Sequence, residues 1–213
     1  MLKCLICSGT IHSFTDTRLQ ATCYACEVCH GIFKSPDSFQ DYSEQKKRYD
    51  LHQNKEESEG YRAYFGRFLD FTLPMVGNVQ SALDFGSGAS TLLAIMMREN
   101  GINCDSYDPI YRSDSTYLQK SYDLIVSVEV FEHLQNPREV FKHLLSRLNS
   151  GGYLAIQTQF HYNDIELFLN WHYRLDPTHV VFFAPETFRY LSDLNNCEYR
   201  GDNGKNMVVI QKR

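Results

Sequence analysis

Short apolar runs alternate with amphipathic stretches along most of the chain after residue 78. A run of about seven mostly apolar residues suits a buried strand, whereas a longer stretch with helical periodicity suits a helix that covers the sheet. The stretch 91–97, directly after the first strand-like run, has this helical character. The alternation predicts an α/β fold with helices on both faces of a sheet. The strand-like runs are 79–85, 102–108, 122–128 and 151–158.

The C-terminal residues extend the same pattern. Residues 185–194 suit a helix, and 197–200 and 207–210 suit two strands paired across the turn 201–204. The stretch between Asp108 and Tyr122, where a third strand belongs, is very short. With that strand included, residues 79–213 are predicted to form one domain with a seven-stranded sheet.

A glycine turn with the sequence Asp-Phe-Gly-Ser-Gly at 84–88 separates the first predicted strand from the first helix. The two glycines let the backbone approach a ligand closely, and a strand-turn-helix of this kind is the nucleotide-binding corner of a Rossmann-like sheet. The next strand ends in Asp108, at the spacing where such folds hold a ribose. The dinucleotide fingerprint fails, because its third glycine would fall near Thr91.

The motif at 84–88 together with Asp108 resembles the class I S-adenosylmethionine (SAM)-dependent methyltransferases. The resemblance covers roughly residues 60–213 and implies SAM as the cofactor. Asp114 is only a weak candidate for the adenine contact. The cofactor-binding residues that the resemblance implies are Asp84, Gly86, Gly88, Asp108 and Glu129.

Two Cys-x-x-Cys pairs, Cys4/Cys7 and Cys26/Cys29, are separated by eighteen residues near the N-terminus. Four thiolates at this spacing are typical of a structural zinc ribbon, which we place at residues 1–36. Cys23 is a spare thiol, so Cys23/Cys26 is an alternative second pair, and a redox pair is the competing interpretation. A ribbon this short cannot bury enough apolar surface to fold without its metal.

Charge argues against nucleic acid as a partner. The chain carries a formal net charge of −5, and the ribbon has a net charge of +1, too little to bind phosphates tightly. No apolar run is long enough to span a membrane, and the first residues lack the apolar core of a signal peptide. We therefore expect a cytoplasmic location, and the oligomeric state cannot be read from the sequence.

Residues 37–78 connect the ribbon to the main domain. Their first part is polar and charged, and the aromatic residues of 61–71 then recur at helical spacing. A helix that packs on the sheet explains this spacing. In class I enzymes the corresponding segment often covers the cofactor cleft, which makes Tyr49, His52 and Tyr61 candidates for a lid.

Acidic and imidazole side chains follow the strand 122–128. With a helical turn there, Glu129, Glu132 and His133 would stand at i, i+3 and i+4 on one face. His179 comes after the strand 151–158, and both loops open at the carboxyl edge of the sheet. These four residues could converge on one Mg²⁺, Mn²⁺, Fe²⁺ or Zn²⁺ ion. Tyr173 and Trp171 could line an acceptor pocket or simply pack.

The Glu-x-x-Glu-His motif with a later histidine is similar to two groups of metal-dependent O-methyltransferases, which act on small RNAs and on quinone precursors. The resemblance implies an ion that lowers the pKa of the acceptor hydroxyl. Without an ion, Glu129 would contact the cofactor, and His133 or His179 could act as general base. We expect O-methylation of a small molecule. The alternatives are an RNA or protein acceptor recognised by the ribbon, and a non-catalytic SAM-binding regulator.

Overall fold

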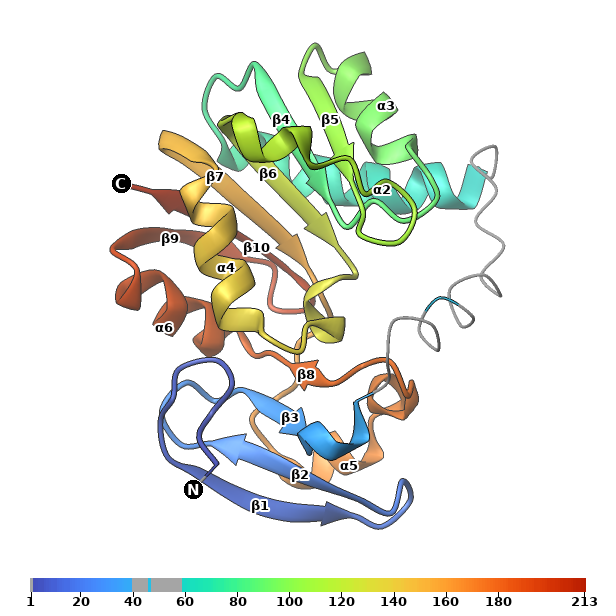
Figure 1. The fold of residues 1–213 in the computed structure, drawn as a ribbon, viewed down its shortest axis with the longest axis vertical. Coiled ribbons are helices and arrows are strands. Elements are labelled where there is room, and N and C mark those ends of the chain that lie inside the picture. The colour runs from blue at the N-terminus through green and yellow to red at the C-terminus, as the bar shows by residue number, and fades with distance from the viewer. Residues whose placement is uncertain (1, 40–45, 47–58) are drawn as a thin grey trace.

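The computed structural model describes residues 2–39, 46 and 59–213 (Figure 1). The lid candidates Tyr49 and His52 lie outside these residues. The main sheet has six strands in the order β5-β4-β6-β7-β10-β9. The first four are parallel to one another, and β10 is antiparallel to both of its neighbours. The strands are β4 (Ser81–Phe85), β5 (Asn103–Tyr107), β6 (Tyr122–Val128), β7 (Leu148–Gln157), β9 (Cys197–Asp202) and β10 (Met207–Lys212).

Helices cover both faces of this sheet, as the alternation of patterns predicts. One face packs against α2 and α3 through a core that includes Phe68 and Leu93, and the other packs against α4 and α6 through Phe141 and Phe188. Short 3-10 turns, η2 (Leu73–Met75) and η3 (Ser115–Gln119), lie between these elements. The helices are α2 (Glu59–Thr72), α3 (Leu92–Glu99), α4 (Pro137–Ser146) and α6 (Pro185–Leu194).

The prediction of seven strands is wrong by one among the described residues. No strand lies between β5 and β6, where the chain forms a tight turn closed by the pair Asp108 and Arg112, followed by η3. A parallel strand needs a crossover connection of about a dozen residues, and the short stretch up to Tyr122 cannot hold both a strand and its crossovers. In the described part of the chain, β5 is therefore an edge of the sheet.

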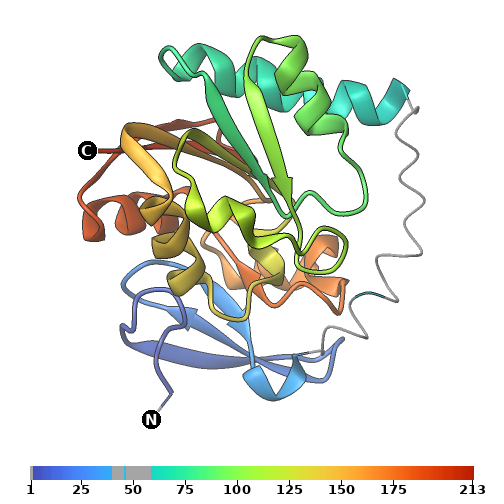
Figure 2. The ribbon, with the colours of Figure 1, turned by 45° about the horizontal axis from the view of Figure 1, so that its top comes forward.

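A second, smaller sheet contains the cysteine pairs. Its order is β1-β2-β3-β8, and all its neighbours are antiparallel. Three strands come from the N-terminus, whereas β8 comes from the loop region after β7, together with α5 and η5. Figures 1 and 2 show this sheet at the end of the molecule toward which the parallel strands point. The elements are β1 (Ile11–Asp16), β2 (Ala21–Cys26), β3 (Ile32–Lys34), η1 (Pro36–Ser38), α5 (Ile165–Asn170), η5 (His172–Leu175) and β8 (Val181–Phe182).

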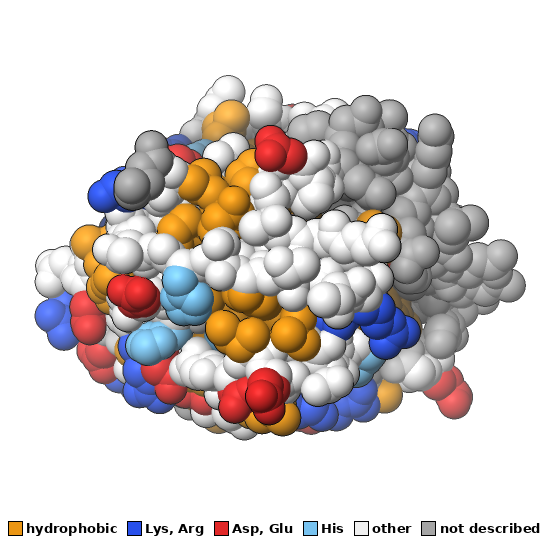
Figure 3. Space-filling view, turned by 90° about the horizontal axis from the view of Figure 1, so that it is seen from below, with side chains coloured by type: hydrophobic (Ala, Val, Ile, Leu, Met, Phe, Trp, Pro, Cys, Tyr) orange, Lys and Arg blue, Asp and Glu red, His pale blue; other side chains and the backbone are white. Residues whose placement is uncertain are grey.

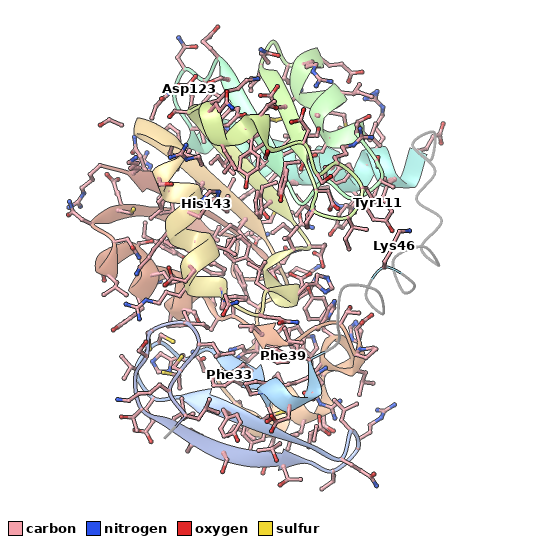
Figure 4. All side chains as sticks on the ribbon, viewed as in Figure 1. Phe33, Phe39, Lys46, Tyr111, Asp123 and His143 are labelled. Carbon is pink, nitrogen blue, oxygen red and sulfur yellow. The ribbon has the colours of Figure 1, made fainter. Side chains whose placement is uncertain are left out.

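The two sheets share one hydrophobic core. Phe33 of β3, labelled in Figure 4, is fully buried in the same cluster as Phe131, Phe183 and Phe188 of the main domain. The ribbon therefore packs directly on the main domain. No helix of the described residues is long and apolar enough to cross a membrane.

Candidate active site and cysteine cluster

Four cysteine thiols converge in the N-terminal sheet, from Cys4, Cys7, Cys26 and Cys29. The Sγ atoms of Cys4 and Cys29 are 3.6 Å apart, and those of Cys7 and Cys26 are 3.4 Å apart. Thiolates bound to one tetrahedral zinc at about 2.3 Å lie about 3.8 Å from one another, so the cluster has nearly the dimensions of a Cys4 zinc site. Cys23 is fully buried elsewhere, in an apolar cluster with Phe168 and Phe182.

Both turns that carry these cysteines have a left-handed residue directly after the second cysteine, Ser8 with φ 62° and His30 with φ 61°. The backbone N–H groups of Gly9 and Val28 donate to the sulfurs of Cys7 and Cys26 at 3.3 and 3.4 Å. A Cβ atom on Gly31 would lie 2.3 Å from Cδ1 of the buried Ile6, so a larger residue there would force the Ile6 side chain to move. The turns are thus built to present sulfur atoms to a common centre.

Repulsion among four thiolates would favour a cation between them. A hydrogen bond from Cys29 lowers the pKa of Cys4 to about 5, and the same contact raises the pKa of Cys29. Four neighbouring thiols cannot all ionise unless a positive charge offsets their repulsion. The thiolate form is also the form that binds metal.

The glycine turn between β4 and α3 packs against the loop that follows β6. Gly86 has φ 81°, and a Cβ atom there would lie 2.4 Å from Val130 Cγ2. Gly88 also has a left-handed backbone, φ 62°, but a Cβ atom there would meet nothing within 4 Å. Packing thus requires Gly86, whereas Gly88 leaves space in which a ligand can approach the backbone.

Asp108 follows β5 and holds this turn. Its Oδ2 accepts a hydrogen bond from Gly88 N–H at 3.0 Å, and its Oδ1 accepts from Ile110 N–H at 2.8 Å and Tyr111 N–H at 2.9 Å. A carboxylate oxygen has two lone pairs, so Oδ2 can accept a further hydrogen bond. The ribose contact of Asp108 stays a prediction.

Asp84 is the last but one residue of β4 and has only 3% of its surface exposed. Burial, followed by the charge of Asp108, raises the pKa of Asp84 to about 7. A cationic ligand group nearby would restore its ionised form. Burial and then the charges of Asp84 and Glu129 raise the pKa of Tyr61, so this tyrosine of α2 lies near both acids. Its role as a lid residue stays a prediction.

Glu129 follows β6 in a left-handed conformation with φ 54°. The prediction that Glu129, Glu132 and His133 share one helical face is therefore wrong, because the 3-10 turn η4 (Phe131–His133) starts two residues later. The Oε1 atom of Glu129 instead accepts a hydrogen bond from the Tyr64 hydroxyl of α2 at 2.9 Å. The Nε2 atom of Gln157, at the end of β7, donates to the same hydroxyl.

The Tyr173 hydroxyl joins the two glutamates. It lies 3.0 Å from Glu129 Oε2 and 2.6 Å from Glu132 Oε1. A phenol has one hydrogen and can donate to only one carboxylate at a time, so the site requires another proton or a cation. Burial, followed by the charge of Glu132, raises the pKa of Glu129 to about 8, and burial raises the pKa of Glu132. Within the described part of the chain, Glu132 Oε2 has no hydrogen-bond partner.

Backbone carbonyls orient both imidazoles of the site. The Nδ1 atom of His133 lies 3.0 Å from the Thr178 carbonyl, and that of His179 lies 2.8 Å from the Tyr173 carbonyl. A carbonyl only accepts, so each Nδ1 carries a hydrogen, and Nε2 carries a lone pair whenever the ring is neutral. Burial and then the charge of His133 lower the pKa of His179 to about 3, which keeps this ring neutral.

Three of the four predicted metal ligands come together. Glu132, His133 and His179 each offer one ligand atom within 4.8 Å of the other two. Glu129 is not a member of this group, and it shares the Tyr173 hydroxyl with Glu132. Sequence reasoning missed Tyr64 and Gln157, because the spacing of aromatic residues in α2 is equally typical of a helix that merely packs on a sheet.

Other acids serve the scaffold. Asp123, at the amino end of β6, accepts hydrogen bonds from Ser81 N–H and Oγ at 3.0 and 2.9 Å and joins β4 to β6 (Figure 4). Asp114 accepts from Thr116 N–H at 3.0 Å and caps η3. It also lines a cavity of about 260 Å³ among α3, β5 and η3, so an adenine contact by Asp114 remains a prediction.

A family model described as a methyltransferase domain matches residues 54–200, more than half of the chain. The chain belongs to this methyltransferase family. The matched segment includes the glycine turn and His179, and the expected SAM-dependent methyltransferase is thereby confirmed. A search of curated proteins found no match.

Two solved structures with a TM-score above 0.5 show the same fold. A SAM-dependent methyltransferase from Archaeoglobus fulgidus aligns with a TM-score of 0.54 and 17% identity, over 81% of this chain and 100% of that one. Human N-acetylserotonin methyltransferase in complex with SAM gives 0.54 and 14%, over 80% and 57%. An O-methyltransferase family protein from Burkholderia thailandensis gives 0.47 and 12%, over 79% and 62%. This methyltransferase therefore spans less than two thirds of the length of the last two.

Proposed function

We propose that this methyltransferase transfers the SAM methyl group to a hydroxyl of a small molecule, with a divalent ion held by Glu132, His133 and His179. The observation that carries the proposal is the convergence of these three side chains beside the glycine turn. Val130, between the two glutamates, packs against Gly86. The methyl donor and the proposed ion would therefore occupy neighbouring positions at the carboxyl edge of the sheet.

The donor set fits a divalent ion. One carboxylate and two imidazoles suit Mn²⁺, Fe²⁺ or Zn²⁺, and less well Mg²⁺. The hydrogen bonds to the Thr178 and Tyr173 carbonyls fix both rings in the tautomer that a metal ligand needs. A buried Glu132 with an unpartnered oxygen is costly without a counter-charge, and a cation would supply one.

For the cofactor, we assign Asp84 to the amino acid part of SAM and Asp108 to its ribose. Gly86 and Gly88 form the turn that lets SAM approach the backbone. Glu129 completes this side of the site. Tyr61 would cover the bound cofactor from α2. Each assignment rests on the placement of these residues around the glycine turn.

The chain's own residues would hold the acceptor and receive its proton. When bound, the ion would stabilise the acceptor oxygen as an alkoxide. Once a nearby cation has restored its ionised form, Glu129 can accept the proton that the acceptor hydroxyl loses as this alkoxide forms. Its bonds to Tyr64 and Tyr173 hold that carboxylate in place. Because the His179 ring has a pKa of about 3, it suits a metal ligand better than a general base.

For the N-terminal sheet we propose a zinc ribbon at residues 1–36 with Cys4, Cys7, Cys26 and Cys29 as ligands. The support is the near-tetrahedral size of the thiol cluster. Residues 37–78 would connect the ribbon to the main domain and cover the cofactor cleft, and residues 79–213 would form the catalytic domain. Four reduced thiols suit a reducing compartment, which favours the cytoplasm.

An RNA acceptor is the weaker alternative. Lys34, one of the three cations of the ribbon, is 5% exposed and faces the interior. Figure 3 shows the ribbon end of the molecule, where the Lys and Arg side chains of the described residues are scattered among Asp and Glu side chains. A steep salt dependence of RNA binding would favour this alternative. Transfer of a labelled methyl group from SAM to a protein would instead favour a protein acceptor.

The test is transfer of labelled methyl from SAM to a panel of catechols, phenols and alcohols, with matched amines, in the presence of Mn²⁺. We expect label on hydroxyl compounds and a loss of at least about 100-fold in Glu132→Gln, with S-adenosylhomocysteine (SAH) affinity unchanged. Asp84→Ala should lose SAH binding. Label on amines alone would contradict the proposed acceptor, and SAM binding without any transfer would favour a regulatory protein.

A further inference from the structure

The loop at 173–179 contributes several groups to the proposed acceptor site, yet contacts with the ribbon hold this loop in place. Tyr173 contributes its hydroxyl and its carbonyl, Thr178 contributes its carbonyl, and His179 contributes its ring. Two residues between them, Arg174 and Asp176, contact β1 and β3. Nothing in the order of these residues along the chain predicts such contacts.

Arg174 provides the first contact. Its Nε atom lies 3.0 Å from Asp16 Oδ2 at the end of β1, and the two side chains are 3% and 1% exposed. A buried ion pair is costly to break on one side, because the other charge is left without a partner. Asp16 is itself fixed, since its Oδ1 accepts hydrogen bonds from Arg18 N–H and Leu19 N–H at 3.1 Å.

Lys34 provides the second contact. The Nζ atom of this buried lysine of β3 donates to the Asp176 carbonyl at 2.8 Å. The backbone N–H of Lys34 donates to the Val180 carbonyl at 2.9 Å, and β3 then pairs with β8. The ribbon thus holds residues on both sides of Thr178 and His179.

We infer that the ribbon is a positioning element of the acceptor site, in which Asp16 and Lys34 fix the loop that orients Tyr173, His133 and His179. This inference rests on the proposed function. The carbonyls of Tyr173 and Thr178 set the histidine tautomers, and those carbonyls are held where Arg174 and Asp176 meet the ribbon. Asp16 and Lys34 act through the loop and touch neither cofactor nor acceptor.

Lys34→Met tests the inference, because it keeps the apolar stem and removes the ammonium donor. Asp16→Asn is the second variant, since its amide oxygen can still accept from Arg18 and Leu19. Lys3→Met, at an exposed lysine of the same ribbon, is the matched control. SAH affinity reports whether each variant keeps the cofactor domain folded.

Two readouts separate positioning from stability. Mn²⁺ affinity, measured by electron paramagnetic resonance, should fall about 10- to 100-fold in Lys34→Met and Asp16→Asn and stay unchanged in Lys3→Met. Imidazole nitrogen NMR should show that His179 keeps its Nδ1–H tautomer in wild type and Lys3→Met and loses it in the other two. SAH-binding variants with wild-type Mn²⁺ affinity and the wild-type tautomer would overturn the inference.

The same experiment distinguishes this failure from that of the proposed function. His179→Ala removes a proposed ligand directly. If it binds Mn²⁺ as wild type does, the proposed metal site is wrong, while the tautomer still tests the role of the ribbon. If His179→Ala loses Mn²⁺ and the Lys34 and Asp16 variants do not, only the inference about the ribbon fails.

Discussion

At the scale of single residues, two glutamates compete for one phenolic hydrogen. Glu132 is fully buried, Glu129 is partly buried, and Tyr173 lies within hydrogen-bond distance of both. In the absence of a cation, burial and mutual repulsion favour protonated carboxyl groups. The site therefore favours the binding of a positive charge, which suits both a divalent ion and the sulfonium of SAM.

Glu129→Gln should change how stability depends on pH. The folded pKa of Glu129, about 8, lies above its unfolded value of 4.5, so its contribution to wild-type stability is present at low pH and lost as pH rises from about 4.5 to about 8. The glutamine does not titrate, so the variant should gain on the order of 5 kcal/mol relative to wild type across that range. Urea unfolding at several pH values, without added divalent ion, measures this.

The same exchange at the exposed Glu139 of α4 is the control for loss of a surface charge. Parallel pH profiles for wild type and Glu129→Gln would contradict the raised pKa.

Gly88→Ala should weaken SAH binding far more than it weakens the fold. An added Cβ atom meets no protein atom there, so the cost in stability is that of the left-handed backbone, about 1 kcal/mol. If SAM lies against this turn, the added methyl group of the alanine collides with the bound SAM. Gly101 has φ 79° and equally open surroundings, so Gly101→Ala is the matched control, in which only the left-handed backbone lowers the stability. Calorimetric titration with SAH compares them, and equal affinities would contradict the assignment of the turn.

The sequence predicted which residue types meet at the site, but it could not predict how they meet. Glu129 was expected on a helical face, and its left-handed backbone aims it at Tyr64 and Gln157 instead. That conformation follows from the packing of the loop after β6 against the glycine turn, a contact between distant segments. Local spacing carries no information about such a contact.

At the scale of elements, the helices and strands of the main domain follow their patterns closely. The predicted strand 122–128 and helix 185–194 coincide with β6 and α6. The two-residue strand β8 was not predicted, because two apolar residues have no periodicity to read. It nevertheless joins the N-terminal sheet to the loop that carries His179.

Cys29→Ser should remove the zinc and the order of the ribbon with it. A structural zinc supplies folding free energy to a module too small to fold alone, and a serine hydroxyl does not replace a thiolate. Zinc content should fall from about one atom per chain to near zero, which elemental analysis measures. Cys23→Ala, at the buried cysteine outside the cluster, should keep its zinc. Zinc lost equally from both variants would contradict the ligand set.

At the scale of the whole molecule, the methyltransferase fold brings the ends of β4, β6 and β7 together and places the ribbon at the same end. The six-stranded sheet lacks one expected edge strand, yet the order of the remaining strands keeps the glycine turn beside Glu129. Composition and charge predicted no strongly basic surface. They could not predict that Asp16 and Lys34 lie buried against the loop at 173–179, because a charged residue in a short ribbon is ordinarily exposed.

The central claim is that a divalent ion binds beside the methyl donor, separately from the zinc of the ribbon. The most direct measurement is elemental analysis of wild type and His179→Ala after equilibration with Mn²⁺ and SAH and removal of unbound ions. The account predicts about one zinc and one manganese per chain in wild type, and about one zinc and no manganese in the variant. About one zinc and no manganese in both proteins would contradict it.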